Sequence, residues 1–165
     1  MTGVKASFGR RALVAGFLVV LAANAPTPGA AQANPFVGTW VLNVAKSTFT
    51  PGPAPKSQTG TYEVVGAGLR ISATVVDAQG KPTSTQYTAN FDGKDYPVTG
   101  NADYDAIVLR RVDANTIEFT RKRAGKVVET GTNVVSKDGK TRTITVDGTN
   151  AQGQTVHNVQ VYDKK

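Results

Sequence analysis

The 165-residue sequence contains no cysteine, one histidine and one tryptophan. Without cysteine it has no disulfide framework, no thiolate chemistry and no cysteine for a lipid anchor. The single histidine, His157, excludes any metal site built from several histidines, and the remaining hard ligands are scattered carboxylates. The sequence therefore predicts no cofactor and no metal site, and His157 is interpreted as an ordinary strand residue.

The common signatures of catalysis are also missing. The sequence has no Gly-x-Ser-x-Gly elbow, no readable Ser-His-Asp grouping, and no glycine-rich phosphate loop that a helix follows. Asp103 and Asp105 would share one face of an extended segment, but their position beside Gly100 is typical of turn caps. We therefore predict that the protein is not an enzyme.

No apolar run reaches the length of about 20 residues that a membrane-spanning helix needs. The run at 12–22 follows Lys5, Arg10 and Arg11 and precedes the small-x-small pattern of residues 31–33, Ala-Gln-Ala. This arrangement is typical of a cleavable signal peptide.

We therefore predict a signal peptide over residues 1–33 and an exported domain over residues 34–165. The domain is expected in the periplasm or outside the cell, without a transmembrane anchor after cleavage. The paired arginines leave both the general secretion route and the twin-arginine route open.

Positive charge is in modest excess. The formal net charge is +7, and removal of the three cations of residues 1–33 leaves +4 on the predicted domain. Because nucleic-acid binding needs a denser basic surface with interleaved aromatic residues, no nucleic-acid partner is predicted.

One segment, residues 110–126, carries most of this excess and is named the basic hairpin. A two-residue loop at 114–115 would place Arg111 opposite Glu118. The hairpin is either a solvated strand face or a surface that attracts anionic lipid, glycan or an acidic partner. Its cations are Arg110, Arg111, Arg121, Lys122, Arg123 and Lys126.

From residue 60 onward, apolar and polar residues alternate with period two, and short turns rich in glycine separate the alternating stretches. Residues 69–77 and 84–91 show the pattern most clearly. Strands that short loops connect must be antiparallel neighbours, so the sequence predicts an all-β, antiparallel up-and-down meander of about 8–10 strands.

Closure of this meander into a barrel would remove its two unpaired edges and leave room for a small ligand. An open or sandwiched sheet is the alternative. The proline-rich segment at 46–59 cannot be helical and predicts a stiff, extended loop across one end of the barrel. This loop is either a spacer or a lid.

The segment 36–42, Phe-Val-Gly-Thr-Trp-Val-Leu, resembles the opening strand of the calycin superfamily, which includes the lipocalins and the fatty-acid-binding proteins. The segment 159–164, Val-Gln-Val-Tyr-Asp-Lys, is similar to the last strand of fatty-acid-binding proteins, Arg-x-Tyr-Glu-Lys. The resemblance implies a secreted, lipocalin-like bacterial domain with a β-barrel fold, in which Gly38 and Trp40 close one end.

The same resemblance limits the ligand. Fatty-acid-binding proteins hold the ligand carboxylate with the arginine and tyrosine of the last strand, and here Gln160 stands at the arginine position beside Tyr162. A neutral amide cannot form the bidentate charged pair that a guanidinium forms. The resemblance therefore implies the barrel and not the fatty-acid site.

We predict a non-enzymatic binding protein that holds a small apolar molecule in the lumen. The alternative is a structural or interaction module of the envelope that acts through the basic hairpin. A cavity of roughly a few hundred Å³ favours the first, and a solid core favours the second. The small residues expected to face inward are Ala73, Thr85, Ala89 and Thr132. The ligand-binding candidates are Tyr62, Tyr87, Phe91, Phe119, Gln160 and Tyr162.

Overall fold

The strands form where the period-two alternation is cleanest in the sequence. In strand β4 (Gly68–Val76), Leu69 and Ile71 are buried, whereas Arg70 and Ser72 between and beyond them are exposed. Successive side chains of a strand point to opposite faces, so this alternation gives the sheet one apolar face and one polar face. The apolar face turns inward.

The computed structural model describes residues 1–3 and 34–165, and all its strands lie in the unit Ala33–Lys165. Most of the predicted signal peptide, residues 4–33, lies outside the described residues. The described elements, besides β4, are β1 (Gly38–Leu42), η1 (Val44–Lys46), β2 (Thr48–Thr50), β3 (Ser57–Val65), β5 (Pro82–Asn90), β6 (Tyr96–Pro97), β7 (Ala106–Arg111), β8 (Thr116–Arg123), β9 (Lys126–Val135), β10 (Thr141–Thr149) and β11 (Thr155–Lys164).

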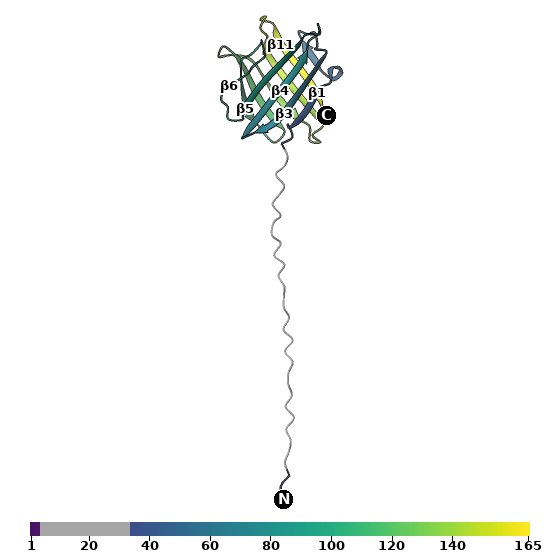
Figure 1. Ribbon diagram of the computed structural model, residues 1–165, viewed down its shortest axis with the longest axis vertical. Coiled ribbons are helices and arrows are strands. Elements are labelled where there is room, and N and C mark those ends of the chain that lie inside the picture. The colour runs from purple at the N-terminus through teal and green to yellow at the C-terminus, as the bar shows by residue number, and fades with distance from the viewer. Residues whose placement is uncertain (4–33) are drawn as a thin grey trace. The chain divides into compact units, whose positions relative to one another are not determined.

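These strands form one antiparallel sheet in the order β5-β4-β3-β1-β11-β10-β9-β8-β7-β6, with β2 added beside β11. Successive strands pair with one another from β3 to β5 and from β6 to β11, and β1 joins the two groups because it pairs with β3 on one side and with β11 on the other, where Trp40 lies opposite Lys164. Figure 1 shows β5, β4, β3 and β1 side by side along one wall of the barrel. The predicted all-β meander, in which the first and last long strands meet, is confirmed.

The ring of strands closes less completely between β5 and the β6–β7 hairpin. Two isolated bridges, Gln86 with Thr99 and Asp92 with Arg110, join these strands in place of a continuous ladder. The structure is therefore a nearly closed barrel, and the alternative of an open or sandwiched sheet was wrong.

Two short strands were not expected from the sequence. β2 lies within the proline-rich segment, and β6 has only two residues, so neither is long enough to show an alternating pattern. Within the described ranges the only helical element is the short 3₁₀ turn η1, and none of the helices there is long and apolar enough to cross a membrane.

Large side chains fill one end of the barrel. Trp40 is fully buried, and its Nε1 donates a hydrogen bond of 2.9 Å to the backbone oxygen of Phe36. The guanidinium of buried Arg142 lies 5.1 Å from the ring centroid of Trp40, 4.3 Å from that of Tyr62 and 4.4 Å from that of Tyr162. Stacking on aromatic faces stabilises this cation, because the rings present their negative faces to it.

Gly38 supports the same end of the barrel through its backbone. Its φ of 126° is a conformation that residues with a side chain rarely adopt, and an added Cβ would lie 2.8 Å from Cε of Lys164. The lysine ammonium in turn lies 5.0 Å from the ring centroid of Trp40. A glycine is therefore needed where the first strand passes the last one.

Replacement of Trp40 by alanine is expected to lower the free energy of unfolding by about 3–5 kcal/mol, because it removes the largest buried side chain and leaves a cavity. Urea denaturation followed by circular dichroism measures this change. The control Val64→Ala removes a side chain that is exposed and should change stability by less than about 0.5 kcal/mol. Equal effects of the two substitutions would contradict the role of Trp40.

Candidate ligand cavity

The lumen is not filled by side chains. A cavity of about 210 Å³ lies inside the barrel, and a smaller space of about 30 Å³ adjoins it. Five residues line both: Tyr62, Ile71, Tyr87, Arg121 and Ile144. The two spaces therefore form one continuous candidate site, named here the lumen cavity.

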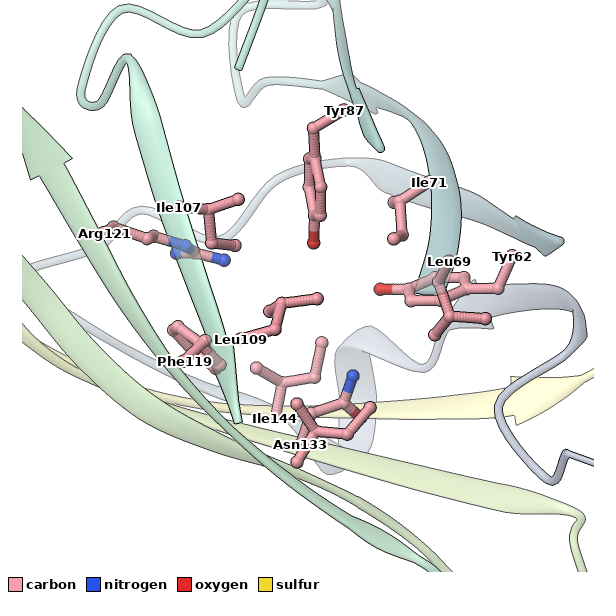
Figure 2. A pocket seen from close by; sticks show the side chains of 11 residues that line it. Tyr62, Leu69, Ile71, Tyr87, Ile107, Leu109, Phe119, Arg121, Asn133 and Ile144 are labelled. Atoms are coloured by element: carbon pink, nitrogen blue, oxygen red, sulfur yellow. The ribbon is translucent and has the colours of Figure 1, made fainter. Parts of the chain in front are cut away.

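Apolar side chains, all but one of them leucine or isoleucine, form most of the wall of the smaller space. They come from four strands, β4, β7, β8 and β10, and each occupies an inward position of the alternating pattern (Figure 2). All of them are buried. They are Leu69, Ile71, Ile107, Leu109, Ile117, Phe119 and Ile144.

Four polar groups point into this apolar space. Figure 2 shows the hydroxyl groups of Tyr62 and Tyr87, the guanidinium of Arg121 and the amide nitrogen of Asn133 directed toward its centre. A few inward polar groups on an apolar wall are the usual composition of a small-molecule site.

Arg121 is the charged group of the cavity, and its position depends on strand pairing. β8 and β9 place it opposite Glu129, and its Nη1 donates to Oε2 of that carboxylate over 2.7 Å. The guanidinium also lies 4.6 Å from the ring centroid of Tyr104 and 4.7 Å from that of Phe119. Both charged side chains are largely buried, with relative exposures of 19% and 8%.

The surroundings of Arg121 keep it charged. Burial alone would lower its pKa, but Tyr104 and the carboxylate of Glu129 raise the pKa above its ordinary value. Its Nε is buried without a hydrogen-bond partner in the described part of the chain. The lumen thus contains an ion pair in which Nη1 of the guanidinium binds Glu129 and Nε makes no hydrogen bond with the described part of the protein.

The cavity opens toward a wider hollow of about 480 Å³ at the mouth of the barrel. The proline-rich segment borders this hollow with Phe49, Pro53 and Pro55, opposite the turn at 77–79. Asp103 stands at the same mouth, where its Oδ1 accepts a hydrogen bond of 3.2 Å from the backbone nitrogen of Ala151. The proline-rich segment therefore lies where a lid would lie.

The predicted ligand-binding residues fall into three groups: those that line both parts of the lumen cavity, those that line one part, and those that lie outside it. Tyr62 and Tyr87 line both parts of the lumen cavity, Phe119 lines the smaller space, and Gln160 lines the larger one. Tyr162 is fully buried at the Trp40 end, where its hydroxyl donates to Oε1 of Gln160 over 2.8 Å.

Phe91 is also outside both spaces, because the guanidinium of Arg111 covers its ring at 4.1 Å. Of the small residues expected inside, Ala73 and Thr85 line the cavity and Ala89 is buried. Thr132 lies between Gly131 and Asn133, which face inward, and itself faces outward. The prediction that Thr132 faces the lumen was therefore wrong.

The basic hairpin does not form one surface. Arg110 pairs with Glu118 and Arg111 with Ile117, so the expected pairing of Arg111 with Glu118 was wrong by one residue. The loop is longer than two residues, because the backbone nitrogens of Val112 and Asp113 both donate to the carbonyl oxygen of Thr116.

This register turns Arg111 and Arg121 inward. Lys122 binds Asp95 on the outside over 2.7 Å. Of the six cations, only Arg110, Arg123 and Lys126 are exposed. Binding of an anionic lipid, glycan or acidic partner stays a prediction and depends on these three.

The remaining polar candidates serve the scaffold. Nδ1 of His157 lies 2.6 Å from Oδ1 of Asp147 on the outer face. Oδ2 of Asp105 accepts a hydrogen bond from the backbone nitrogen of Ala124. In residues 1–3 and 34–165, no group of three or more acidic, histidine or cysteine side chains could hold a metal ion.

Sequence reasoning missed three residues of the site: Arg121 was assigned to the surface, and Asn133 and Glu129 were not singled out. The alternation Ile117, Phe119, Arg121 is the signal that could have placed the arginine inside. The partner of Arg121, Glu129, lies opposite it in the pairing of β8 with β9.

No protein-family profile and no curated protein matches the sequence. Among solved structures, the chain is similar to zebrafish ileal bile acid-binding protein complexed with cholic acid, with a TM-score of 0.48 and 13% sequence identity. The match covers 79% of this chain and 99% of the zebrafish chain. A sequence identity this low gives no information about a ligand of this chain.

Buried tyrosines give the protein a stability limit at high pH. Burial raises the pKa of Tyr87, Tyr104 and Tyr162 above the ordinary tyrosine value of about 10. The unfolded chain releases these protons near that pH while the folded chain keeps them, so stability falls as pH rises above about 10.

Two measurements check this limit. The midpoint of urea unfolding should move to lower urea between about pH 9 and 11. Absorbance of tyrosinate should show three of the five tyrosines ionising only above the ordinary range or on unfolding. Ordinary titration of all five would contradict the buried positions.

Proposed function

We propose that residues 34–165 form a non-enzymatic binding protein that holds a small, mostly apolar molecule in the lumen cavity. One observation carries the proposal: a cavity of about 210 Å³ persists inside a barrel whose other end is filled around Trp40. The lining of this larger space is mainly polar, with four aliphatic side chains, and the adjoining smaller space has a mostly apolar wall, so the two together offer a ligand both polar and apolar contacts.

The mouth of the barrel supports the same function. The lumen cavity and the hollow at the mouth share Gln58, Val75, Asp103 and Gln160, so a ligand has a path from solvent to the interior. β2 pairs with β11 and sets Phe49 beside this path. The proline-rich segment therefore borders the path by which the ligand would enter and leave the cavity.

We further propose that the domain acts after export. The support is the sequence pattern of residues 1–33: a basic start, an apolar run and the Ala-Gln-Ala pattern at 31–33. The ligand would then be a molecule that the protein meets in the periplasm or outside the cell.

Native mass spectrometry of the protein purified from its own host tests both statements. The chain is expected to begin at Asn34, and a small molecule of constant mass is expected to leave it on gentle activation. A chain that retains residues 1–33 would contradict export. Repeated absence of a small molecule, together with a filled lumen in a crystal structure, would contradict the binding function.

Two neighbouring substitutions on β4 locate the ligand. Ala73 lines the lumen cavity, so Ala73→Phe should fill it and weaken ligand binding by about tenfold or more, a change of about 1.4 kcal/mol. Thr74 is exposed on the outer face of the same strand, so Thr74→Phe should leave binding unchanged. Equal binding by the two variants, each shown to be folded by circular dichroism, would place the ligand outside the lumen.

A further inference from the structure

The four polar side chains that point into the smaller space of the lumen cavity can all donate hydrogen bonds. The guanidinium of Arg121 only donates, whereas the hydroxyl groups of Tyr62 and Tyr87 and the amide of Asn133, whose Oδ1 is buried without a partner in the described part of the chain, both donate and accept. Buried donors that lose water without gaining an acceptor are costly. A pure hydrocarbon in this cavity would leave several of them unpaired.

The charges around the cavity disfavour an anionic ligand. Arg121 is the only cation among the residues that line the larger space, which also contains the carboxylates of Glu129 and Asp103. Glu129 already lies 2.7 Å from the guanidinium. A ligand carboxylate would either lie beside this negative charge or displace it and leave a buried carboxylate without its partner.

From these two observations we propose that the ligand carries an uncharged hydrogen-bond acceptor, such as the carbonyl oxygen of a ketone or ester. The acceptor receives hydrogen bonds from Arg121 and Tyr87, while the apolar body of the ligand packs against the aliphatic side chains of the larger space, Ile71, Val75 and Ile144. The ion pair with Glu129 makes Arg121 a donor to a neutral group rather than a receptor for an anion. This inference rests on the proposed binding function.

Three naphthalene probes of similar shape separate the possibilities: 2-acetylnaphthalene, which has a neutral acceptor, 2-naphthoate, which is anionic, and 2-isopropylnaphthalene, which is apolar. Isothermal titration calorimetry at neutral pH should show the ketone binding about tenfold more tightly than either of the others. Tighter binding of the naphthoate, or equal binding of the ketone and the hydrocarbon, would overturn the inference and leave the binding function intact. Failure of all three probes, with no co-purifying molecule, would overturn both.

Charge variants test the cause of the selectivity. Glu129→Gln leaves Arg121 without a carboxylate partner. The affinity of the protein for the naphthoate, relative to its affinity for the ketone, should therefore increase by about tenfold. The matched control Glu118→Gln changes the same residue type on β8, where Glu118 is exposed opposite Arg110, and should change nothing. An unchanged ligand preference in folded Glu129→Gln would show that the ion pair does not set the selectivity.

A third substitution keeps the test decisive if Glu129→Gln does not fold. Tyr87→Phe removes one inward donor and retains the ring. It should weaken binding of the ketone by about fivefold to tenfold and leave binding of the hydrocarbon unchanged. Equal loss for both probes would indicate a packing role for Tyr87 and would contradict a hydrogen bond to the ligand.

Discussion

The antiparallel pairing of β1 with β11 is the contact on which the barrel depends. It joins the first strand of the described sheet to the last one and places Leu42 opposite Tyr162 and Trp40 opposite Lys164. Without it, the sheet would expose two long unpaired edges, which invite association with other chains. The same pairing brings Trp40, Tyr162 and Arg142 together at one end.

The division of the lumen into a filled end and a hollow end explains where the site lies. At the filled end, three aromatic rings surround Arg142, and its Nε and Nη1 are buried without a hydrogen-bond partner in the described part of the chain. In the hollow part, small residues such as Ala73 and Thr85 line the larger space of the cavity. The two buried arginines therefore differ in role: Arg142 packs, and Arg121 faces the cavity.

Most of the fold could be predicted from the sequence, because alternation and turn chemistry are local properties. The stretches at 69–77 and 84–91 became β4 and β5, and the pairing of the first and last strands followed from the need to remove edges. The register of the basic hairpin could not be predicted in the same way. Its turn lacks glycine, and a shift of one residue moves every side chain to the other face.

The candidate site was predictable for several inward aromatic and small residues and for Gln160. Tyr62 and Tyr87 were expected at the cavity because aromatic residues at inward positions of a barrel line or fill it. Arg121 was not, because a charged side chain in a strand is usually exposed unless a partner is known. Its partner, Glu129, becomes its neighbour only through the β8–β9 pairing, which includes a register shift beside Arg121. Pairing across strands, and not composition, decides which charges are inside.

A high-resolution crystal structure of the protein purified from its own host tests this account most directly. The account predicts electron density for a compact molecule in the lumen cavity, with an uncharged oxygen within hydrogen-bond distance of Arg121 and the hydroxyl of Tyr87. The Arg121–Glu129 ion pair should remain intact beside it. A lumen collapsed onto its own side chains, or a bound carboxylate that has displaced Glu129, would contradict it.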